Sequence, residues 1–303
     1  MRKLLLMQSP LRIGWIGTGV MGNAMAGHLI AGGHSLLVHS RTRARADVLI
    51  ERGAVWAENP AQAASGTDVV FSMVALPSDV ESVHLGASGT LSAPVAPRLV
   101  VDMTSSSPSL ARKIATIAGA RGIPSLDAPV TGGDVGARNA TRSIMVGGSE
   151  EAFQTALPLL HLMGKTVVRQ GDAGYGQQAK LANQILIAST MLGVCEAMLY
   201  ARASGLDPTR VLESVSAGAA GSWALSNLAP RILKGNFDPG FFIDHFVKDL
   251  GIAIDECRAI GIEPPGLIVA QKLYQMAQEA DLGRHGTHAL YQVYEAAKGA
   301  PSL

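Results

Sequence analysis

The chain has 303 residues, with 25 basic and 24 acidic side chains and a formal net charge of +1. This balance and a hydrophobic fraction of 48% argue against disorder, and they give no electrostatic reason to expect binding to nucleic acid or to an anionic membrane surface. The two cysteines, Cys195 and Cys257, are too few for a disulfide framework or a four-cysteine zinc site. A reducing location, cytoplasmic or in an organelle matrix, therefore fits better than secretion.

The chain begins with a short lead-in, residues 1–10, whose apolar part is shorter than the roughly 7–15 residues of a secretory signal. The most apolar charge-free stretch, residues 181–195, is also shorter than the about 20 residues that cross a bilayer. We therefore expect neither a secretory signal peptide nor a membrane span.

The first half of the chain alternates apolar runs with helical patterns. The runs are typical of buried strands and lie at residues 11–16, 35–39, 68–76, 99–101 and 123–127. Strands that alternate with helices need crossover connections, which give a parallel sheet with helices on both faces. Two later runs, residues 143–148 and 166–168, are expected to extend the same sheet.

The pattern changes near Gly171. A long apolar helix is expected over residues 177–204, and turn signals separate the helical segments that follow it, among which we find no convincing strand. The fold class is therefore α/β followed by all-α, with the long helix as the connection. We place the α/β domain at residues 11–172 and the helical domain, which includes the long helix, at residues 173–303.

One glycine-rich segment, residues 17–22, has the pattern G-x-G-x-x-G and consists of Gly17, Thr18, Gly19, Val20, Met21 and Gly22. Alone the pattern is weak, but here it follows a predicted strand and opens a helix, as a dinucleotide fingerprint requires. Its glycines allow a tight turn, and the N-terminus of the helix favours a pyrophosphate. A glycine-rich turn without a ligand is the alternative. We predict a Rossmann-type dinucleotide-binding domain.

The end of the second predicted strand bears on the choice of cofactor. An NAD site usually has Asp or Glu there for the ribose 2′-OH, but this chain has Ser40, Arg41 and Thr42, with no carboxylate until Asp47. Arg41 can face a 2′-phosphate, and the two hydroxyls can donate hydrogen bonds to it. We therefore predict that NADP (NADPH) is preferred to NAD. The alternative is that Arg41 and Arg43 are solvated loop charges.

Other strand ends should border the same crevice, because ligands of open α/β sheets bind at the carboxyl ends of the strands. Leu76 ends the third predicted strand and Pro77 follows it, and both are predicted to contact the cofactor. Thr104 and Ser105 follow the fourth strand and offer hydroxyls to the nicotinamide half. Capping of the next helix, which should begin near Ser107, is the alternative for both residues. For Thr104 the two interpretations are equal, and for Ser105 only the family resemblance described below favours the contact with the cofactor.

Four motifs together resemble those of the β-hydroxyacid dehydrogenases, the family of 3-hydroxyisobutyrate dehydrogenase and of the glyoxylate and succinic semialdehyde reductases. They are the fingerprint at residues 17–26, a segment similar to the substrate signature at 127–133, one similar to the catalytic segment at 174–184, and one similar to a late cofactor motif at 245–250. Together they span most of the chain. Within the family the chain resembles the plant-type 3-hydroxyisobutyrate dehydrogenase-like proteins most.

The resemblance implies that Lys180 is the catalytic acid/base, which protonates a carbonyl oxygen as hydride arrives from the cofactor. The start of a long helix and burial both disfavour an ammonium, so its pKa should fall toward neutrality. Asn183 shares the helix face of Lys180 and would orient it or bind the substrate. Lys248 would meet the cofactor or close the cleft. A solvated charge paired with Asp249 or Asp244 is the alternative for Lys248.

The substrate signature implies that Thr131, Gly132 and Gly133 bind a small carboxylate, because consecutive backbone N–H groups can form an anion nest. One departure follows. Where relatives usually have Gly-Thr-Leu, this chain has Ala-Thr-Arg, which places Arg142 close in sequence to the carboxylate site, with Arg138 nearby. We interpret both arginines as loop charges. The alternative is that they alter the choice of substrate.

These features predict an oxidoreductase that transfers a hydride between NADP(H) and a small hydroxy acid, semialdehyde or keto acid of the 3-hydroxyisobutyrate, glyoxylate or succinic semialdehyde type. The alternatives are an imine reductase, which would be expected to replace the lysine, and a non-catalytic NADP-binding sensor or scaffold. We expect no metal site, because His285 and His288 lack a third ligand nearby. Apolar faces in the helical domain predict a homodimer or homotetramer.

Overall fold

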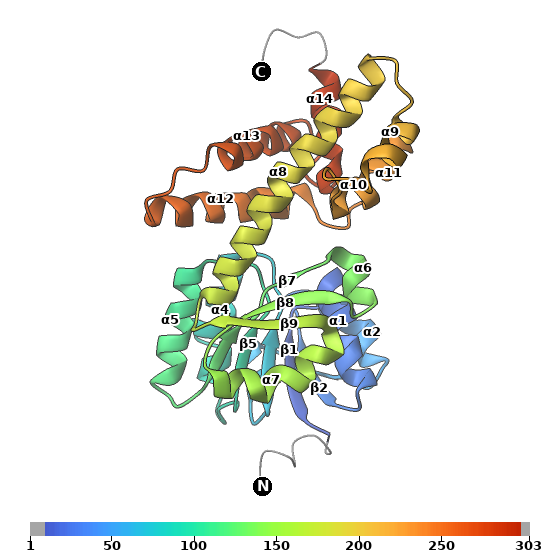
Figure 1. Cartoon of the computed structure of the whole chain (residues 1–303). Helices are drawn as coiled ribbons and strands as arrows, with labels where there is room; N and C mark the ends of the chain where they lie inside the picture. Colours follow the sequence, from blue (N-terminus) through green and yellow to red (C-terminus); the bar gives the residue numbers. More distant parts are fainter. Residues whose placement is uncertain (1–9, 298–303) are drawn as a thin grey trace. The chain divides into compact units, whose positions relative to one another are not determined.

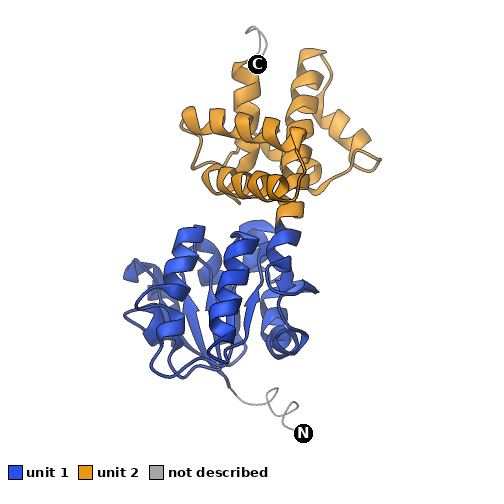
Figure 2. Ribbon diagram, turned by 90° about the vertical axis from the view of Figure 1, so that its left-hand side faces the viewer, with its two compact units in different colours: residues 1–180 blue, residues 181–303 orange. Residues whose placement is uncertain are grey.

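The structure of the chain, a computed structural model, describes residues 10–297. The predicted lead-in, residues 1–10, therefore lies outside the described residues except for Pro10. The chain divides into two compact units, which we name unit 1 (residues 1–180) and unit 2 (residues 181–303) (Figure 2). The division falls inside one long helix, so Lys180 is the last residue of unit 1.

Unit 1 is built on a nine-stranded sheet with the strand order β3-β2-β1-β4-β5-β6-β8-β7, and β9 pairs with β8 (Figure 1). The strands are β1 (Arg12–Ile16), β2 (Ser35–His39), β3 (Val55–Trp56), β4 (Val69–Ser72), β5 (Val100–Asp102), β6 (Ser125–Asp127), β7 (Val130–Thr131), β8 (Arg142–Gly147) and β9 (Gly164–Gly171). Strands β1 to β6 are parallel, and β8 runs antiparallel to β6 and β7. The order 3-2-1-4-5-6 is that of a Rossmann fold, whose ligand crevice lies where the order reverses, beside β1 and β4.

Both faces of this sheet are covered, because successive residues of the central strands enter different cores. Trp15 and Phe71 pack in the larger core with residues of α1 and α7, whereas Ile16 and Val70 pack in a smaller core with residues of α3 and α5. The helices of unit 1 are α1 (Val20–Ala31), α2 (Asp47–Ile50), α3 (Pro60–Ala64), α4 (Pro77–Leu85), α5 (Pro108–Gly119), α6 (Gly133–Arg138) and α7 (Glu150–Met163), with 3-10 turns η2 (Arg43–Ala46) and η3 (Thr90–Ser92). The doubly wound α/β prediction is confirmed.

The predicted strands are present, with differences at their ends. The third one, predicted over residues 68–76, ends at Ser72, because its neighbours β1 and β5 end at Ile16 and Asp102 and leave the following residues without a partner strand. Strands β3 and β7 and helix α6 were not predicted from the sequence. Two of these are strands of two residues each, too short for any periodicity.

Unit 2 is helical, and between residues 181 and 297 the structure contains no named strand. Its helices are α8 (Tyr175–Ala203), which begins in unit 1, α9 (Pro208–Val215), α10 (Trp223–Asn227), α11 (Ala229–Leu233), α12 (Ile243–Ala259), α13 (Pro265–Glu279) and α14 (Leu290–Ala296), with the 3-10 turn η4 (Thr287–Ala289). Its core gathers around Met191 and Cys195 of α8 and around Phe246 and Tyr274, whose rings meet edge to face at 4.9 Å. The predicted all-helical second domain is confirmed.

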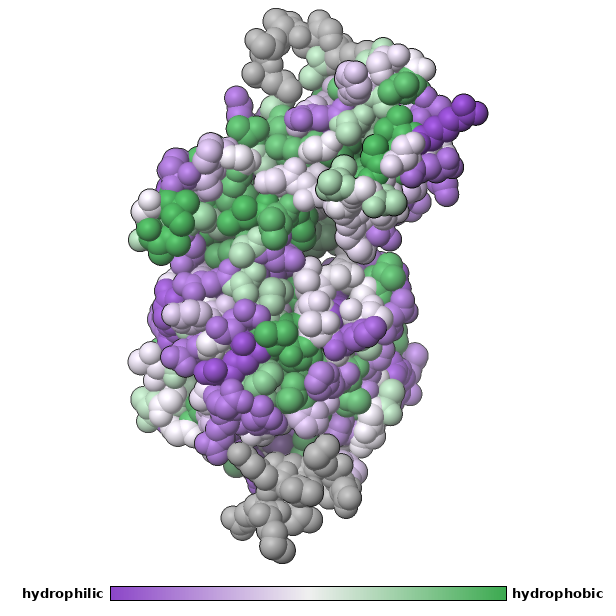
Figure 3. Space-filling model, in the orientation of Figure 1, coloured by the Kyte–Doolittle hydropathy of each residue, from purple (hydrophilic) through white to green (hydrophobic). Residues whose placement is uncertain are grey.

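Helix α8 is the one helix among residues 10–297 that is long and apolar enough, by length and composition alone, to cross a membrane. Its buried residues, such as Ala188 and Met191, belong to the hydrophobic core of unit 2, as is typical of a core helix. Unit 2 also exposes large hydrophobic side chains, among them Leu186, Ile260, Ile262 and Val269. Figure 3 shows green, hydrophobic patches on the face of the molecule that it draws. The absence of a membrane span and the self-association of the chain both stay predictions.

Candidate functional site

The glycine fingerprint forms the turn between β1 and α1. Gly17 has a φ of +96° and donates from its N–H to the carbonyl of His39 at 2.8 Å. A Cβ at Gly17 would collide with the Met73 carbonyl, and one at Gly22 would collide with the Gly17 carbonyl. At Gly19, in contrast, a Cβ would meet nothing within 4 Å. Two glycines thus serve the turn and the helix packing, and the third leaves open space beside the backbone.

The start of α1 fits the pyrophosphate of a dinucleotide. The N-cap residue Gly19 supplies no side-chain cap, and the first turn of α1 holds no acidic residue. The N–H groups of this turn are therefore free of side-chain competition, and the helix dipole favours an anion there. Val20 is 64% exposed, and the Thr18 hydroxyl is buried without a hydrogen-bond partner. Gly17 to Gly22 thus form a cradle of the predicted kind.

Arg41 lies in the loop after β2, and its side chain is 85% exposed. Its Nη1 lies 3.4 Å from Oδ1 of Asp79, and the other oxygen of Asp79 accepts a hydrogen bond from the Leu76 N–H at 3.2 Å. Asp79 is in the first turn of α4, which begins at Pro77. The structure thereby brings together two groups predicted from separate segments, the end of β2 and the end of β4.

The neighbours of Arg41 differ in their surroundings. Ser40 is half-buried and Thr42 is exposed, and neither has a side-chain hydrogen bond in the structure that we describe. The Arg43 guanidinium lies over the Trp56 ring, 5.6 Å from its centroid. Arg43 is therefore an exposed cation that also stacks on Trp56, and the contact of Ser40, Arg41 and Thr42 with the cofactor stays a prediction.

The loop after β5 uses Thr104 structurally. Its side chain is buried, and its Oγ1 accepts a hydrogen bond from the Val74 N–H at 3.0 Å. Helix α5 is capped instead by Ser107, whose hydroxyl accepts from the Leu110 N–H at 3.2 Å. The capping alternative for Thr104 is therefore wrong, since its hydroxyl joins the ends of β4 and β5, whereas its contact with the nicotinamide half stays a prediction. Ser105, the next residue, is half-buried.

At the ends of β4 and β5 lies a buried network of hydrogen-bonded side chains that was not predicted from the sequence. Ser72 donates to Oδ1 of Asp102 at 2.7 Å, His84 Nε2 lies 2.8 Å from the Ser72 hydroxyl, and His84 Nδ1 lies 2.8 Å from the Thr90 hydroxyl. Burial lowers the pKa of His84 to about 4 and raises that of Asp102 to about 6. No sequence signal could have found this network, because its members are up to 30 residues apart in the sequence.

Asp127, the first residue of the substrate signature, holds the start of α8. Its Oδ1 accepts from the Gly174 N–H at 2.7 Å and its Oδ2 accepts from the Gln177 N–H at 2.8 Å. Burial raises the pKa of Asp127 to about 6, while these hydrogen bonds act in the opposite direction. Two glycines allow the close approach, since a Cβ at Gly147 or Gly176 would collide with atoms of Asp127.

The side chain of Gln177 makes a second connection from α8. Its Oε1 accepts from the Ser106 N–H at 2.9 Å, and its Nε2 donates to the Thr104 carbonyl at 2.8 Å. Gln177 is fully buried. Lys180 follows three residues later, so it lies on the same side of α8, and its relative exposure is 5%. The first turn of α8 thus fixes Lys180 relative to the β5 loop and the substrate signature.

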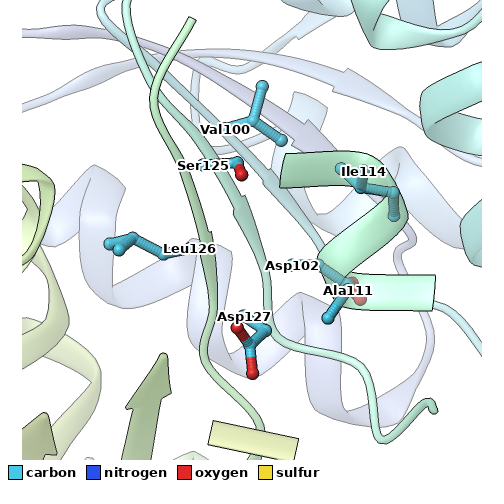
Figure 4. A pocket seen from close by; sticks show the side chains of 7 residues that line it. All are labelled: Val100, Asp102, Ala111, Ile114, Ser125, Leu126 and Asp127. Atoms are coloured by element: carbon cyan, nitrogen blue, oxygen red, sulfur yellow. The ribbon is translucent and has the colours of Figure 1, made fainter. Parts of the chain in front are cut away.

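The hollow drawn in Figure 4 lies between β5, β6 and α5 and is lined by Val100, Asp102, Ala111, Ile114, Ser125, Leu126 and Asp127. Asp102 and Asp127 are register partners on neighbouring strands. The volume of about 10 Å³ is near that of one water molecule, so the hollow cannot hold a substrate.

The residues of the predicted anion nest, 131–133, form a turn that depends on glycine. Thr131 ends β7 and pairs with Ser143 of β8, and then Gly132 and Gly133 have φ values of +122° and +63°. Side chains other than hydrogen are disfavoured at such angles. The turn leads directly into α6, which the sequence analysis did not predict. We refer to residues 131–133 as the substrate turn.

The interpretation of Arg142 as a loop charge is wrong. Arg142 is the first residue of β8 and is fully buried. It hydrogen bonds to the Gly133 carbonyl, and its Nη2 lies 3.0 Å from Sδ of Met21. The error arose because β8 was expected to begin one residue later. Arg138 does carry a solvent-exposed charge, but on α6, where it pairs with Asp134 at 2.7 Å.

Two predicted site residues belong to unit 2. Asn183 donates from Nδ2 to Oε1 of Gln184 at 2.8 Å, and Gln184 donates to Oδ2 of Asp249 at 2.6 Å. Lys248 forms an ion pair with Oδ1 of Asp249 at 2.9 Å, and its side chain is 16% exposed. Lys248 is therefore paired with Asp249, as the alternative proposed, but it is not a solvated charge.

Comparison with known proteins assigns the chain to a family. Residues 12–171 match the family model of the NAD binding domain of 6-phosphogluconate dehydrogenase, and residues 174–294 match the model described as NAD-binding of NADP-dependent 3-hydroxyisobutyrate dehydrogenase. The chain is 50% identical over 288 residues to the probable 3-hydroxyisobutyrate dehydrogenase-like 1, mitochondrial, of Arabidopsis thaliana, which covers 95% of this chain and 86% of that protein.

Two solved structures extend the likeness to three dimensions. The 3-hydroxyisobutyrate dehydrogenase of Mycobacterium tuberculosis matches with a TM-score of 0.86 and 28% identity, over 94% of this chain and 99% of that one. Psf3, solved in complex with NADP⁺ and 2-OPP, matches with a TM-score of 0.84 and 25% identity, over 93% of this chain and 99% of that one. The cradle and the fold agree with these matches. The chain belongs to the NAD(P)-dependent β-hydroxyacid dehydrogenases, as an oxidoreductase of the 3-hydroxyisobutyrate dehydrogenase-like group that acts on CH–OH groups.

Proposed function

We propose that this protein interconverts a small hydroxy acid and its semialdehyde or keto acid with NADP(H), and that Lys180 is the general acid/base. The observation that carries this proposal is the anchoring of α8. Asp127 of the substrate signature and the β5 loop both hold the first turn of the helix, and Lys180 follows one turn later, 5% exposed. A lysine held in this way can be fixed against a reacting carbonyl.

The chemistry divides between the cofactor and the protein. When bound, the nicotinamide ring supplies hydride to the carbonyl carbon in reduction and accepts it in oxidation. In reduction, the Lys180 ammonium gives a proton to the carbonyl oxygen, which leaves an alcohol and a neutral amine. In oxidation, the neutral amine accepts the alcohol proton. The substrate turn, with the Thr131 hydroxyl and the N–H groups of Gly132 and Gly133, would hold the carboxylate. Asn183 would orient Lys180 or bind the substrate.

We propose NADP rather than NAD as the preferred cofactor. Three observations support this choice: Ser40 stands where an NAD site has a carboxylate, Arg41 is 85% exposed beside it, and the related Psf3 was solved with NADP⁺. Asp79 holds Arg41 at 3.4 Å, on the side of α4. A 2′-phosphate would offer Arg41 a doubly charged partner in place of this exposed ion pair. A contact of Lys248 with the cofactor is part of the same proposal.

The test is an assay of NADPH and NADH oxidation with glyoxylate, succinic semialdehyde, methylmalonate semialdehyde and tartronate semialdehyde. We expect turnover with NADPH and at least one of these acids, and a loss of at least about a hundredfold in Lys180→Ala. Lys165→Ala is the matched control, because Lys165 lies in β9 and is exposed. No turnover with any acid would overturn the proposal and direct attention to imines or to a non-catalytic role, whereas full activity in Lys180→Ala would overturn the role of the lysine alone.

A further inference from the structure

Arg142 is a feature of unit 1 that the proposed chemistry does not use. Its relative exposure is 0%, and along β8 it shares a strand face with Ile144 and Val146, which pack in the larger core. A leucine at this position, as the family pattern leads us to expect, would simply extend that core. An arginine there needs a physical reason, because burying a charge is costly unless it gains a partner.

The guanidinium of Arg142 joins the two halves of the candidate site. It hydrogen bonds to the Gly133 carbonyl in the substrate turn, and its Nη2 lies 3.0 Å from Sδ of Met21 in the fingerprint. The fold leaves space for this side chain, since a Cβ at Gly136 would lie 3.3 Å from Cγ of Arg142. The charged side chain of Arg142 therefore contacts the backbone of the turn that is proposed to hold the carboxylate.

The charge of Arg142 has no carboxylate partner among the described residues. Its Nε and Nη1 are buried and make no hydrogen bond. Asp134 influences it electrostatically but gives its own carboxylate to Arg138 at 2.7 Å. Burial lowers the pKa of Arg142 only to about 10, so the group is charged at neutral pH. A bound anion would offset part of the cost of this buried cation.

We propose that Arg142 is a positioning and specificity residue for the carboxylate of the substrate. Through Gly133 it fixes the substrate turn, and its buried positive charge makes the turn favour an anion over a neutral analogue. We assign the effect to the substrate carboxylate and not to the pyrophosphate of the cofactor. Arg142 donates its hydrogen bond to the backbone of Gly133 in the substrate turn, whereas in the fingerprint it contacts only the thioether sulfur of Met21. This inference rests on the proposed function, in which residues 131–133 hold the carboxylate.

The experiment compares Arg142→Leu, Arg142→Met and Arg142→Lys with the wild type, using the acid that the wild type reduces best and its methyl ester. In the two neutral variants we expect KM for the acid to rise about tenfold, the size of one charge-assisted contact, while KM for the ester and for NADPH changes little. Arg142→Lys should restore part of the preference for the acid, because it keeps the charge but not the guanidinium geometry.

A purely structural role would change KM for the acid and for the ester equally, and that result would overturn the inference. A rise in KM for NADPH alone would assign the charge to the cofactor and overturn it as well. Malonate binding, followed as a shift in melting temperature with NADP⁺ present, is the readout that does not need turnover. We expect malonate to stabilise the wild type and not Arg142→Met. Failure of the proposed function is distinct, since it appears as a wild type that reduces no acid.

Discussion

The carboxylate of Asp127 accepts a hydrogen bond from the Gln177 N–H at 2.8 Å. Asp127 opens the substrate signature, and Gln177 lies in the first turn of α8, three residues before Lys180. One buried carboxylate thus joins the segment proposed to hold the substrate to the helix that carries the proposed acid/base. The side chain of Gln177 adds the β5 loop through the Thr104 carbonyl at 2.8 Å. These contacts of Asp127 and Gln177 fix the first turn of α8, the helix that carries Lys180.

The anchoring of α8 can be tested with two glycines of that helix. A Cβ at Gly176 would collide with the carbonyls of Asp127 and Met145, whereas a Cβ at Gly193 would meet nothing within 4 Å. We expect Gly176→Ala to lower kcat at least about tenfold, because a displacement of about 1 Å can cost a factor of a hundred in rate. Gly193→Ala should keep its activity and gain about 0.5–1 kcal/mol of stability from helix propensity.

Assays of kcat and urea unfolding of both variants measure these effects. Equal kcat values in Gly176→Ala and Gly193→Ala would show that the close packing of the first turn of α8 does not determine the rate.

Arg41 should set the preference for NADPH. We expect Arg41→Ala to raise KM for NADPH about tenfold, the size of one charge-assisted phosphate contact, and to leave KM for NADH nearly unchanged. Arg98→Ala is the matched control, because Arg98 is also exposed, at 77%, and also lies 3.4 Å from a carboxylate, that of Asp68. Steady-state kinetics with NADPH and with NADH measure KM for each cofactor in the wild type and in both variants. If the ratio of KM for NADPH to KM for NADH were the same in Arg41→Ala as in the wild type, the prediction would be contradicted.

His84 should make stability depend on pH. Burial lowers its pKa from 6.5 to about 4, so the folded chain binds this proton less readily than the unfolded chain. Its contribution to stability is therefore fully present above pH 6.5 and is lost as the pH falls toward 4. Asp102 acts in the opposite sense, because its pKa is raised from 3.8 to about 6, and its contribution is lost as the pH rises through 6.

A comparison with His84→Asn isolates the histidine, since Asp102 is common to both proteins. Between pH 6.5 and 5 we expect the free energy of unfolding of the wild type to fall by up to about 1.4 kcal/mol per pH unit more than that of the variant. Urea unfolding at intervals of half a pH unit measures the difference. Parallel profiles for the two proteins would mean that His84 titrates normally in the folded chain.

The exposed apolar side chains of unit 2 lead us to expect self-association. Leu186 on α8 is 69% exposed, and Val269 on α13 is 52% exposed. We expect light scattering to give a mass at least twice that of one chain, and Leu186→Glu to lower it. Val168→Glu is the control, because Val168 is a 47% exposed hydrophobic residue on β9 of unit 1. A wild type with the mass of a single chain would contradict the prediction.

Much of the fold could be predicted from the sequence, because the relevant signals are local. The apolar runs gave β1, β2 and β5 to within one or two residues at either end, and the long apolar helical pattern over residues 177–204 gave α8 to within two residues. The fingerprint at residues 17–22 was recognisable because a strand precedes it and a helix follows it. Spacing of this kind depends only on the periods of strand and helix, which neighbouring residues determine.

What the tertiary structure alone decided are contacts between distant segments. The hydrogen bond from Ser72 to Asp102 spans 30 residues, and the contact of Arg142 with Met21 spans 121. No periodicity records such pairs, because each depends on which strands become neighbours in the sheet. The sequence by itself therefore determined the class of cofactor site and the segment that carries Lys180, whereas the burial of Arg142 and the attachment of α8 to Asp127 followed from the packing of β6 and β8 against helices far away in the chain.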